Sequence, residues 1–588
     1  MLKADNNVTL NQYRLALSTI WILILILLVR YFQIQILEHE NYSNKSKSNR
    51  IRKVIKNAPR GLILDRNGEI LVDNFPIYVL KAIPGEFLNK DAQFELISKY
   101  VSIDSSALKK NYKKYYRGKF IPTQIAKDIS FKQISFLEEN KLNFQGIYYD
   151  QIPERSFPQN IRSPHLFGYV KEVDRKIRRD LVLKNSYELG DLIGWSGLEK
   201  QYESYLRGNS GVSFYEVDAF GREVGTASEI QEKRPDPGLN IQTTIDSRIQ
   251  KLSEELMNQR KGVLLIADSK TGQILAAVSS PDYQPSLFTG KTSIDDWAFI
   301  RDNKDKPLMN RYIRGAYPPG SIVKMITSAV LYENEAITSE LEYDCDGSYQ
   351  FGDRIFGCWN RQGHGLINIS EAIAFSCDVY FYKAVRNLDF DELALMFTDF
   401  GFGSKTNIDL PNERTGLVPN RNYMTKRYGK FGWSQGALLN MAIGQGELLA
   451  TPVQILNYTN LLATKGKSDV PHFVMATNLP NNVKPKLNED TWSKIHTDMR
   501  SVIKHGKGTG RKANPDINGM IVYGKTGTAE NSHGDDHAWF IGWANYQGEN
   551  YTVIVLMENA GSGGSIAAPI ARDLFKIISE NIVTKSNA

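Results

Sequence analysis

The C-terminal part of the sequence predicts an α+β fold, in which one antiparallel sheet is covered by helices. Residues 263–279 form two apolar runs around a Lys270-Thr271-Gly272 turn, a pattern typical of two strands joined by a turn. Residues 537–543 and 551–557 read as two further apolar strands, and residues 566–582 read as a helix. Because strands from both ends of this region enclose helical segments in the sequence, we expect one sheet with the helices packed on it.

Length and composition set broad limits on the class of protein. A chain of 588 residues is long enough for more than one domain, and 41% hydrophobic with 23% charged residues is ordinary for a globular protein. The net charge of +7 is small for this length, and no run of basic residues alternates with aromatic ones. The charge argues neither for nor against nucleic-acid binding, but the lack of a basic and aromatic run argues against it, and the lack of internal repeats argues against a solenoid.

An apolar segment near the N-terminus predicts a membrane anchor. Residues 15–29 are almost wholly apolar, and further apolar residues up to Leu37 bring the segment close to the ~20 residues of a spanning helix. No small-residue cleavage site follows, so we expect an uncleaved signal-anchor; the alternative is a core helix. The flanking basic residues do not fix its orientation, because long domains cross a membrane largely regardless of charge. We therefore expect a short cytoplasmic tail at 1–14 and a transmembrane helix at 15–38.

The next region, residues 39–235, is polar and shows no catalytic pattern. A strand-like run at residues 60–65 ends at Asn67-Gly68, a strong turn signal. Pro235-Asp236-Pro237-Gly238 marks its far boundary. We expect an extended non-catalytic domain, a pedestal, over 39–235 and a catalytic domain over 236–588.

The stretch Tyr317–Lys324 (YPPGSIVK) predicts a nucleophilic serine. Two prolines and a glycine precede an apolar helical pattern, so we expect Ser321 to open a buried helix. Residues three apart share one helical face, which places the Lys324 amine beside the Ser321 hydroxyl. A buried lysine loses its charge readily and can then accept the serine proton. The helix N-terminus would also stabilise the oxyanion formed when the serine attacks a carbonyl.

Two later motifs strengthen this reading, because an S-x-x-K motif alone is weak. Ser376-Cys377-Asp378 follows it, and Lys525-Thr526-Gly527-Thr528 comes later in the chain. S-x-x-K, then S-x-N or a variant, then K-T-G is the ordered set that marks penicillin-recognising serine acyl-transferases. All three occur here in that order.

A nucleotide-binding loop is the main rival reading of the third motif. Residues 519–526 satisfy the pattern G-x4-G-K-[ST], which in nucleotide hydrolases is a flexible loop between a strand and a helix. Here the spacer is Met-Ile-Val-Tyr, which prefers a strand. We therefore expect Lys525 on an edge strand beside the serine, where it and Thr526 hold a substrate carboxylate, and no nucleotide or organic cofactor.

All three cysteines of the chain lie between the first and second motifs, together with a histidine. Cys345, Cys358, His364 and Cys377 have the spacing C-x12-C-x5-H-x12-C, which predicts a tetrahedral Cys3His zinc site. Such a site would hold the loop that carries Ser376. The alternatives are a Cys345–Cys358 disulfide with Cys377 free, or three unrelated thiols, with His364 in a solvated turn.

The motifs taken together resemble one family over nearly the whole chain. Residues 316–324, 376–382, 442–454 and 524–530 are similar to the penicillin-binding protein 2 branch of class B D,D-transpeptidases, the elongation enzymes. The S-x-D motif and the Cys/His cluster distinguish this branch from the division branch. Further segments resemble the pedestal of class B enzymes: residues 60–68, 154–158, 165–170, 197–199 and 206–208. Two departures stand out: relatives often have aspartates where Cys345 and Cys358 stand, and proline where Asn545 stands.

The resemblance implies a two-step acyl transfer. Ser321, deprotonated by Lys324, would attack a terminal D-Ala-D-Ala pentapeptide and release D-alanine, and an amine of a second stem peptide would then resolve the ester. Ser376 would relay the proton, Asp378 would orient Lys324 and Ser376, and Lys525 with Thr526, Gly527 and Thr528 would bind the substrate. The backbone N–H groups of Ser321 and Thr528 would form the oxyanion hole. β-Lactams would acylate the same serine, and a carboxypeptidase side activity is expected.

The resemblance also implies partners and a location. No glycosyltransferase-sized region precedes the pedestal, so a SEDS-family membrane glycosyltransferase and other elongation-complex proteins are the expected partners, and nucleic acid is not. The expected location is the bacterial cytoplasmic (inner) membrane, with a single pass and the catalytic domain in the periplasm. The alternatives are a division-branch transpeptidase, a β-lactam sensor and an inactive wall-synthesis scaffold.

Overall fold

The chain folds into two compact units, each built from several segments. The first contains Met1–Pro59, Pro76–Ile152 and Gly208–Pro237, and the second contains Arg60–Phe75, Pro153–Arg207 and Gly238–Ala588. The predicted domain division at residue 236 stays a prediction. The computed structural model describes residues 10–40, 42, 51–87, 89–119, 121–144, 146–180, 187, 190–217, 223–226, 231–289, 292, 294–475, 479–531 and 534–582.

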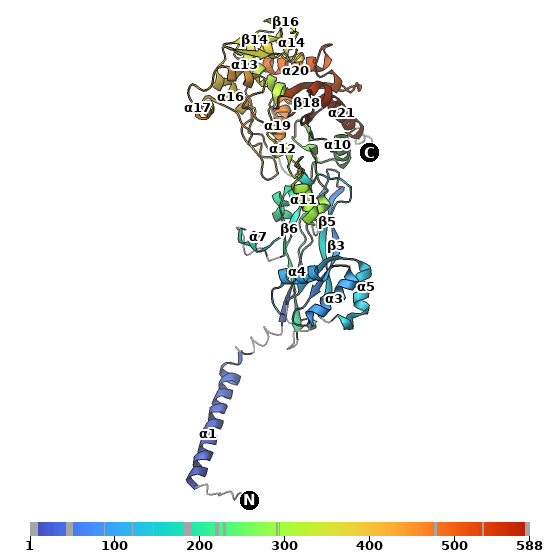
Figure 1. Cartoon of the computed structure of the whole chain (residues 1–588), viewed down its shortest axis with the longest axis vertical. Helices are drawn as coiled ribbons and strands as arrows, with labels where there is room; N and C mark the ends of the chain where they lie inside the picture. Colours follow the sequence, from blue (N-terminus) through green and yellow to red (C-terminus); the bar gives the residue numbers. More distant parts are fainter. Residues whose placement is uncertain are drawn as a thin grey trace. The chain divides into compact units, whose positions relative to one another are not determined.

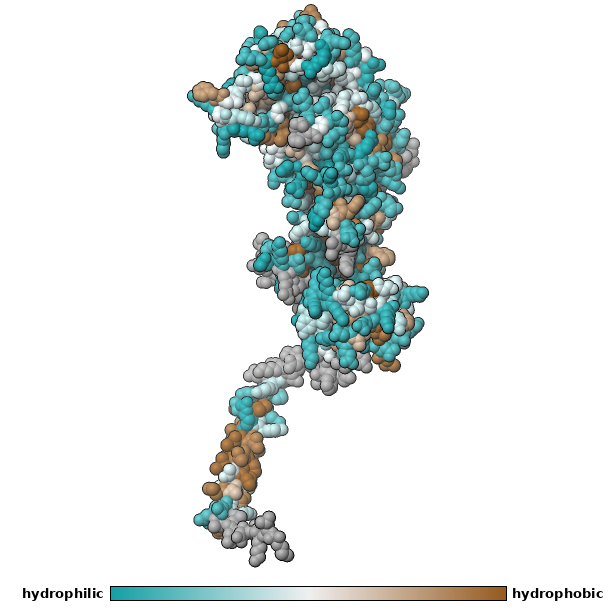
Figure 2. All heavy atoms as spheres, viewed as in Figure 1, coloured by the Kyte–Doolittle hydropathy of each residue, from teal (hydrophilic) through white to brown (hydrophobic). Residues whose placement is uncertain are grey.

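The N-terminal apolar segment forms a helix. Helix α1 spans Leu10–Phe32 and continues as a π-helical turn over Gln33–Leu37. Within the described residues, Leu10–Leu37 is long and apolar enough to cross a membrane, and none of its side chains is buried. Its surface in Figure 2 is accordingly a continuous hydrophobic band. The predicted apolar helix is therefore present, and it begins a few residues earlier than expected.

The first unit pairs small sheets with three helices. A three-stranded sheet has the order β1-β8-β9, and β3 pairs with both β4 and β5. Apolar side chains such as Leu80, Phe94 and Ile125 form its core. Its elements are β1 (Ile51–Lys56), β4 (Thr123–Ile129), β5 (Ile147–Ser156), β8 (Gly211–Val217), β9 (Glu223–Thr226), α3 (Lys90–Val101), α4 (Ser105–Tyr115), α5 (Phe131–Glu139) and most of β3 (Ile70–Ala82).

Motifs far apart in the sequence meet in a buried ion network of the second unit. Arg60 Nη2 lies 2.6 Å from Glu199 Oε2 and 2.6 Å from Glu203 Oε2, and Arg155 Nε lies 2.7 Å from Glu199 Oε1. Asn74 completes the network by accepting a 3.1 Å hydrogen bond from Arg155. Residues 60–68, 154–158 and 197–199, three of the segments that resemble the class B pedestal, therefore meet here. Each buried charge of the network has a partner of opposite charge, as burial of a charge requires.

Short elements surround this network. They are β2 (Ile63–Leu64), α6 (Pro164–Phe167), β6 (Val170–Glu172), α7 (Arg175–Asp180), β7 (Leu192–Gly194), α8 (Gly197–Gln201), α9 (Glu203–Leu206) and β10 (Ile241–Gln242). The turn predicted at Asn67-Gly68 joins β2 to β3, with Gly68 at a φ of 89°. A positive φ is the conformation for which glycine is suited.

The main sheet of the second unit confirms the predicted α+β fold. Its strand order is β12-β11-β19-β18-β17, and every neighbouring pair is antiparallel. The strands from the two ends of the region therefore lie side by side, as the sequence predicted. The strands are β11 (Gly262–Asp268), β12 (Ile274–Ser280), β17 (Ile521–Ala529), β18 (His537–Tyr546) and β19 (Glu549–Met557).

Helices cover both faces of this sheet because successive strand residues point to opposite sides. Val263 and Leu265 join the larger core with α13, α14, α15 and α19, whereas Leu264 and Ile266 join a second core with α10 and α21. The helices named here are α10 (Ser247–Met257), α13 (Lys324–Glu333), α14 (Ile369–Ala374), α15 (Asp378–Ala384), α19 (Pro452–Ala463) and α21 (Ala568–Ile582).

The remaining elements of the second unit lie on or beside the larger core. They are α11 (Ile294–Arg301), α12 (Arg311–Arg314), α16 (Phe390–Asp399), α17 (Arg421–Tyr428), α18 (Gly436–Ala442), α20 (Glu489–Lys504) and the short strands β13 (Tyr343–Cys345), β14 (Ser348–Phe351), β15 (Arg354–Gly357) and β16 (Gly365–Ile367). β13 pairs with β16, and β14 pairs with β15 as a hairpin.

Candidate active site

Ser321 lies on a tight turn that precedes the helix. Residues Gly320–Val323 form a 3-10 turn, and α13 begins only at Lys324, so the expectation that Ser321 opens the α-helix itself was wrong by one turn. The backbone N–H of Lys324 donates to the Ser321 carbonyl. Side chains three apart eclipse one another in 3-10 geometry, so Ser321 and Lys324 still share one face.

The third motif packs directly against this turn, and two glycines permit it. A Cβ at Gly320 would lie 2.7 Å from the Thr528 carbonyl oxygen, and a Cβ at Gly527 would lie 2.8 Å from Ile322 Cγ2. Gly320 also has a φ of +60°. β17 is the edge strand of the main sheet, which confirms the strand expected for residues 521–526 and rules out a strand-to-helix nucleotide loop.

Lys324 is fully buried and is held by the second motif. Its Nζ donates to Asp378 Oδ1 at 2.8 Å and to the Ser376 carbonyl at 2.9 Å. Among the described residues, no hydrogen bond joins Lys324 Nζ to Ser321 Oγ. Trp359 N–H donates to the other oxygen of Asp378 at 3.2 Å, so the carboxylate is fixed from two sides.

Ser376 joins the second motif to the third. Its φ of 58° lies in the left-handed region, a costly conformation for a serine that often marks a functional site. Its hydroxyl accepts a 2.8 Å hydrogen bond from Lys525 Nζ. Lys525 is fully buried, and its pKa is held well below the usual range. Burial is the larger cause, the positive charge of Lys324 adds to it, and the negative charge of Asp378 opposes the shift. A lysine in this setting readily exists as a neutral amine.

The rest of β17 presents hydrogen-bonding groups next to the serine turn. Thr526 Oγ1 donates to Thr509 Oγ1 at 2.7 Å, and the Thr528 carbonyl accepts from Gln445 Nε2 at 3.4 Å. Gly527 lies between them, where its missing side chain allows the turn of Ser321 to approach. The eight residues predicted for catalysis and substrate binding therefore lie on three adjoining stretches of chain, residues 321–324, 376–378 and 525–528: Ser321, Lys324, Ser376, Asp378, Lys525, Thr526, Gly527 and Thr528.

The four residues of the predicted metal site also lie together. The ligand atoms of Cys345, Cys358, His364 and Cys377 all lie within 4.8 Å of one another. His364 Nδ1 is 3.6 Å from Cys345 Sγ and 3.6 Å from Cys358 Sγ. With Zn–S of about 2.3 Å and Zn–N of about 2.0 Å, tetrahedral geometry separates a sulfur and a nitrogen ligand by about 3.6 Å. The donor set and spacing therefore fit zinc.

The electrostatics of this cluster favour thiolates at two positions. The pKa of Cys345 is lowered to about 6, and the pKa of Cys358 is lower still. The largest cause of both shifts is a hydrogen bond with Cys377. A hydrogen bond with His364 acts in the same direction, and burial opposes both shifts. None of the three cysteines is in a disulfide. Cys377 also caps α15, the helix that begins at Asp378, so the cluster fixes the second motif.

Two features of the site have no signal in the sequence. Trp359 anchors the second motif through its backbone contact to Asp378 and through Nε1, which donates to the Phe375 carbonyl at 3.0 Å. Gln445 reaches β17 from a loop that also packs on the serine turn. The residue sequence around Gln445 was noted only for its family resemblance, and no local pattern predicted either contact.

The fold and the three converging motifs define a serine acyl-transferase of the penicillin-recognising class. Residues 262–576 match the family of the penicillin binding protein transpeptidase domain, and residues 55–243 match the penicillin-binding protein dimerisation domain. The chain belongs to the penicillin-binding protein transpeptidase family. The fold, the family and the enzyme class predicted from the sequence are thereby confirmed.

Individual relatives resemble the chain over most of its length. It is 31% identical to the peptidoglycan D,D-transpeptidase MrdA of Haemophilus influenzae, over 97% of this chain and 92% of that protein. The structure is similar to penicillin-binding protein 2 of Helicobacter pylori, solved in complex with MreC, with a TM-score of 0.80, 30% identity and coverage of 90% of this chain and 99% of that one. The structure is also similar to Pseudomonas aeruginosa PBP2, solved in complex with WCK 5153. The TM-score is 0.66 and the identity 28%, and the match covers 90% of this chain and 96% of that one.

Proposed function

We propose that this protein is the D,D-transpeptidase that crosslinks peptidoglycan stem peptides during cell elongation, and that β-lactams acylate its serine. The observation that carries the proposal is the convergence of the Ser321 turn, the Ser376 loop and β17 into one buried, hydrogen-bonded site. Its relatives named as peptidoglycan D,D-transpeptidases support the same reaction.

The first step forms an ester on Ser321. The Ser321 oxygen bonds to the carbonyl carbon of the penultimate D-alanine, its proton passes to Lys324, and the bond to the terminal D-alanine nitrogen breaks. The leaving nitrogen takes a proton through Ser376, whose hydroxyl is hydrogen-bonded to Lys525. The 2.8 Å contact with Asp378 orients Lys324, which accepts the serine proton as the neutral amine.

The second step regenerates the serine. The amine of a second stem peptide bonds to the ester carbon, the bond to the Ser321 oxygen breaks, and the proton lost by the amine returns to the serine. The backbone N–H groups of Ser321 and Thr528 would hold the oxyanion in both steps. Lys525 and the Thr526 hydroxyl would bind the substrate carboxylate, with Gly527 permitting the close approach.

A structural zinc ion is part of this proposal. Cys345, Cys358, His364 and Cys377 would hold it, and the ion would supply a fixed cross-link between the β13–β16 pair and the start of α15. The 3.6 Å separations and the shifted thiol pKa values support this assignment. The site would position Ser376 and Asp378 and take no part in the acyl transfer.

The location and the partners follow from the anchor helix and the relatives. We assign α1 to a single pass through the bacterial cytoplasmic membrane, with the catalytic unit on the periplasmic side, where its wall substrate lies. A Helicobacter pylori relative was solved as a complex with MreC, which supports elongation-complex partners for this chain. A SEDS-family glycosyltransferase would supply the glycan strands.

Other functions find less support. A division-branch enzyme is not favoured, because relatives that are 28–31% identical over most of the chain are MrdA proteins. A β-lactam sensor could share the three motifs, but it would normally carry several membrane helices, whereas one candidate span is found among the described residues. An inactive scaffold would have no need of every motif residue, and none is lost here.

A crosslinking assay tests the proposal. The full chain in detergent is mixed with uncrosslinked glycan strands that carry pentapeptides, and muropeptides and released D-alanine are quantified. We expect crosslinked dimers with wild-type protein and none with Ser321→Ala. Equal crosslinking by the two proteins would refute the assignment of Ser321.

A further inference from the structure

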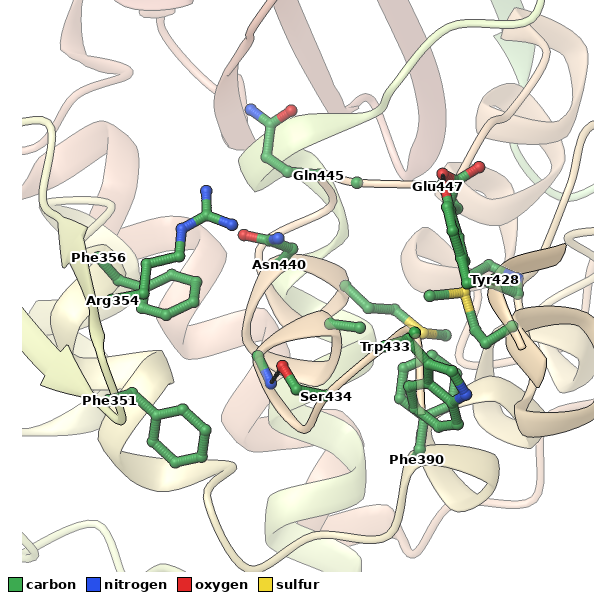
Figure 3. A pocket seen from close by; sticks show the side chains of 17 residues that line it. Phe351, Arg354, Phe356, Phe390, Tyr428, Trp433, Ser434, Asn440, Gln445 and Glu447 are labelled. Carbon is green, nitrogen blue, oxygen red and sulfur yellow. Dashed lines mark hydrogen bonds between the residues drawn. The ribbon is translucent and has the colours of Figure 1, made fainter. Parts of the chain in front are cut away.

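A cavity of about 270 Å³ adjoins the active site, between the β14–β15 hairpin, α17 and α18 (Figure 3). Arg354, Trp433 and Gln445 are among the residues that line it. Gln445 also donates to the Thr528 carbonyl on β17 at 3.4 Å. The cavity is therefore counted with the site described above, whereas a charged surface of the first unit has no role in that site.

Helix α4 and the residues that follow it carry a concentrated positive charge. Residues 105–119 contain six Lys or Arg and no Asp or Glu, whereas the whole chain has a net charge of only +7. The expectation that no basic run alternates with aromatic residues was wrong for residues 109–119, which read KKNYKKYYRGK. This short segment thus differs in charge from the rest of the chain.

The cations lie on the outer side of α4 because its apolar side chains belong to the core. Leu108 and Tyr112 are buried, and the Tyr112 ring lies 5.6 Å from the ring of Phe94 on α3. Residues three and four apart share a helical face, so the lysines between these core positions point the other way. The exposed cations, named here the α4 surface, are Lys110, Lys113, Lys114, Arg117 and Lys119.

Few acidic groups neutralise this charge within the unit. Lys109, at the edge of the α4 surface, pairs with Asp91 of α3 at 2.8 Å. Lys110 and Lys113 make no ion pair among the residues that the structure describes. A surface on which cations so far outnumber acids attracts an anionic partner.

The chain itself keeps the first unit close to a membrane. The apolar anchor ends at Leu37, and β1 of the same unit begins at Ile51, so 13 residues lie between them. A fully extended segment of this length spans at most about 50 Å. The headgroups of the anchoring bilayer are therefore an extended anionic surface that stays within reach of this unit.

The residues around the cations are suited to a membrane interface. Tyr116 is 46% exposed, and tyrosines are enriched at the level of lipid headgroups because their rings are amphipathic. Lysine binds phosphate as a point charge. Because the apolar side chains of α4 are buried in the core, the helix would contact headgroups through its charges and would not insert among the acyl chains.

We propose that the α4 surface binds the anionic phospholipid headgroups of the membrane in which the chain is anchored. The lipid phosphates contact Lys110, Lys113 and their neighbours and hold the first unit against the bilayer. This inference rests on the proposed membrane location and adds a lipid-binding role for the non-catalytic unit. The attraction of lysines to an anionic bilayer falls off within a Debye length, so the contact requires anionic lipid and weakens in salt.

Lysine acetylation of the full chain in nanodiscs tests this contact. The discs contain either phosphatidylglycerol mixed with phosphatidylcholine or phosphatidylcholine alone. Peptide mass spectrometry measures the labelling rates of Lys110 and Lys113 relative to Lys512, an exposed lysine of the second unit. We expect phosphatidylglycerol to slow the labelling of both by roughly threefold or more. Salt at about 1 M, where the Debye length is about 3 Å, should remove this protection.

Two double variants separate the α4 surface from the overall charge of the protein. Lys113→Gln with Arg117→Gln removes two cations of the α4 surface, and Lys110 should then lose most of its protection. Lys132→Gln with Lys405→Gln removes two exposed cations from α5 and the second unit, and should leave the protection of Lys110 unchanged. All four positions are exposed, so both variants should fold, which thermal unfolding checks.

Three results would overturn the α4 surface as a lipid site. They are equal labelling of Lys110 in the two kinds of disc, protection that persists in about 1 M salt, and protection that survives Lys113→Gln with Arg117→Gln. A chain that did not stay with the discs would overturn the membrane location and this proposal with it. Labelling needs no catalysis, so failure of benzylpenicillin to acylate the wild-type protein would overturn the proposed reaction alone.

Discussion

At the scale of single residues, burial is what changes the chemistry of common side chains. Lys324 and Lys525 are both fully buried, yet only Lys324 has a carboxylate in contact, and Lys525 is instead bonded to a hydroxyl. The low pKa of Lys525 follows from this difference, because the positive charge of Lys324 adds to the cost of burial. The sequence predicted a buried lysine next to Ser321; it did not indicate which lysine would lack a counter-charge.

A buried carboxylate gives a pH-dependent prediction. Burial raises the pKa of Asp498 on α20 from 3.8 to about 6, and hydrogen bonds from Ser370 and Tyr332 oppose the shift. Between these two pH values Asp498 loses its proton in the unfolded chain but keeps it in the folded chain. The free energy of unfolding therefore falls as the pH rises from about 4 to about 6. Asp498→Asn removes the titration and keeps an oxygen that can accept from Tyr332.

Thermal unfolding at pH 4.5 and pH 7.5 checks this prediction. The stability of Asp498→Asn relative to wild type should increase between these pH values by roughly 2 kcal/mol, since one pKa unit corresponds to about 1.4 kcal/mol and about 1.5 units of the window lie above pH 4.5. Asp490→Asn, at an exposed position of the same helix, is the control and should show little change. A difference between Asp498→Asn and wild type that is independent of pH would contradict the assignment.

At the scale of elements, the structure is held by residues that are far apart in the chain. Glu199 is 139 residues from Arg60 and 44 from Arg155, and it is 2% exposed. Local patterns predicted the strand and turn at residues 60–68, but pairing over such a separation leaves no periodicity in the sequence. The family resemblance identified these segments without indicating that they meet.

Removing Glu199 should strongly destabilise the second unit. Glu199→Ala leaves two buried guanidinium groups short of a counter-charge, for which a cost of about 3–5 kcal/mol is typical. Arg421→Ala breaks the exposed pair with Asp389 but leaves the hydrogen bonds by which Asp389 caps α16, and it should cost less than about 1 kcal/mol. Urea unfolding of the full chain in detergent measures both, and similar costs for the two variants would show that the network adds nothing to stability.

The Cys3His cluster makes a prediction of its own. Protein purified without chelators should contain about one zinc ion per chain by mass spectrometry, and chelation should lower its unfolding temperature. His364→Ala should lose the metal, whereas His505→Ala, a change at another histidine of the same unit, should retain it. Metal-free wild-type protein, or equal metal in both variants, would argue for a cluster of hydrogen-bonded thiols.

At the scale of the whole molecule, the fold was largely predictable and the surroundings of the site were not. Runs of apolar residues predicted strands of the main sheet, and motif order predicted which elements would meet at Ser321. The 3-10 turn at Gly320–Val323 replaced the expected first helical turn, because Gly320 adopts a φ of +60° to approach β17. The cavity lined by Arg354 and Trp433 could not be predicted, since its walls come from segments whose packing no local pattern reports.

The central claim is that Ser321 is the acylated nucleophile. The full chain in detergent is incubated with benzylpenicillin, and intact and peptide masses are recorded beside those of Ser321→Ala. We expect a stable adduct of one drug molecule per chain, located on the Ser321 peptide and absent from the variant. An adduct that persists in Ser321→Ala, or a wild-type protein that forms none, would contradict it.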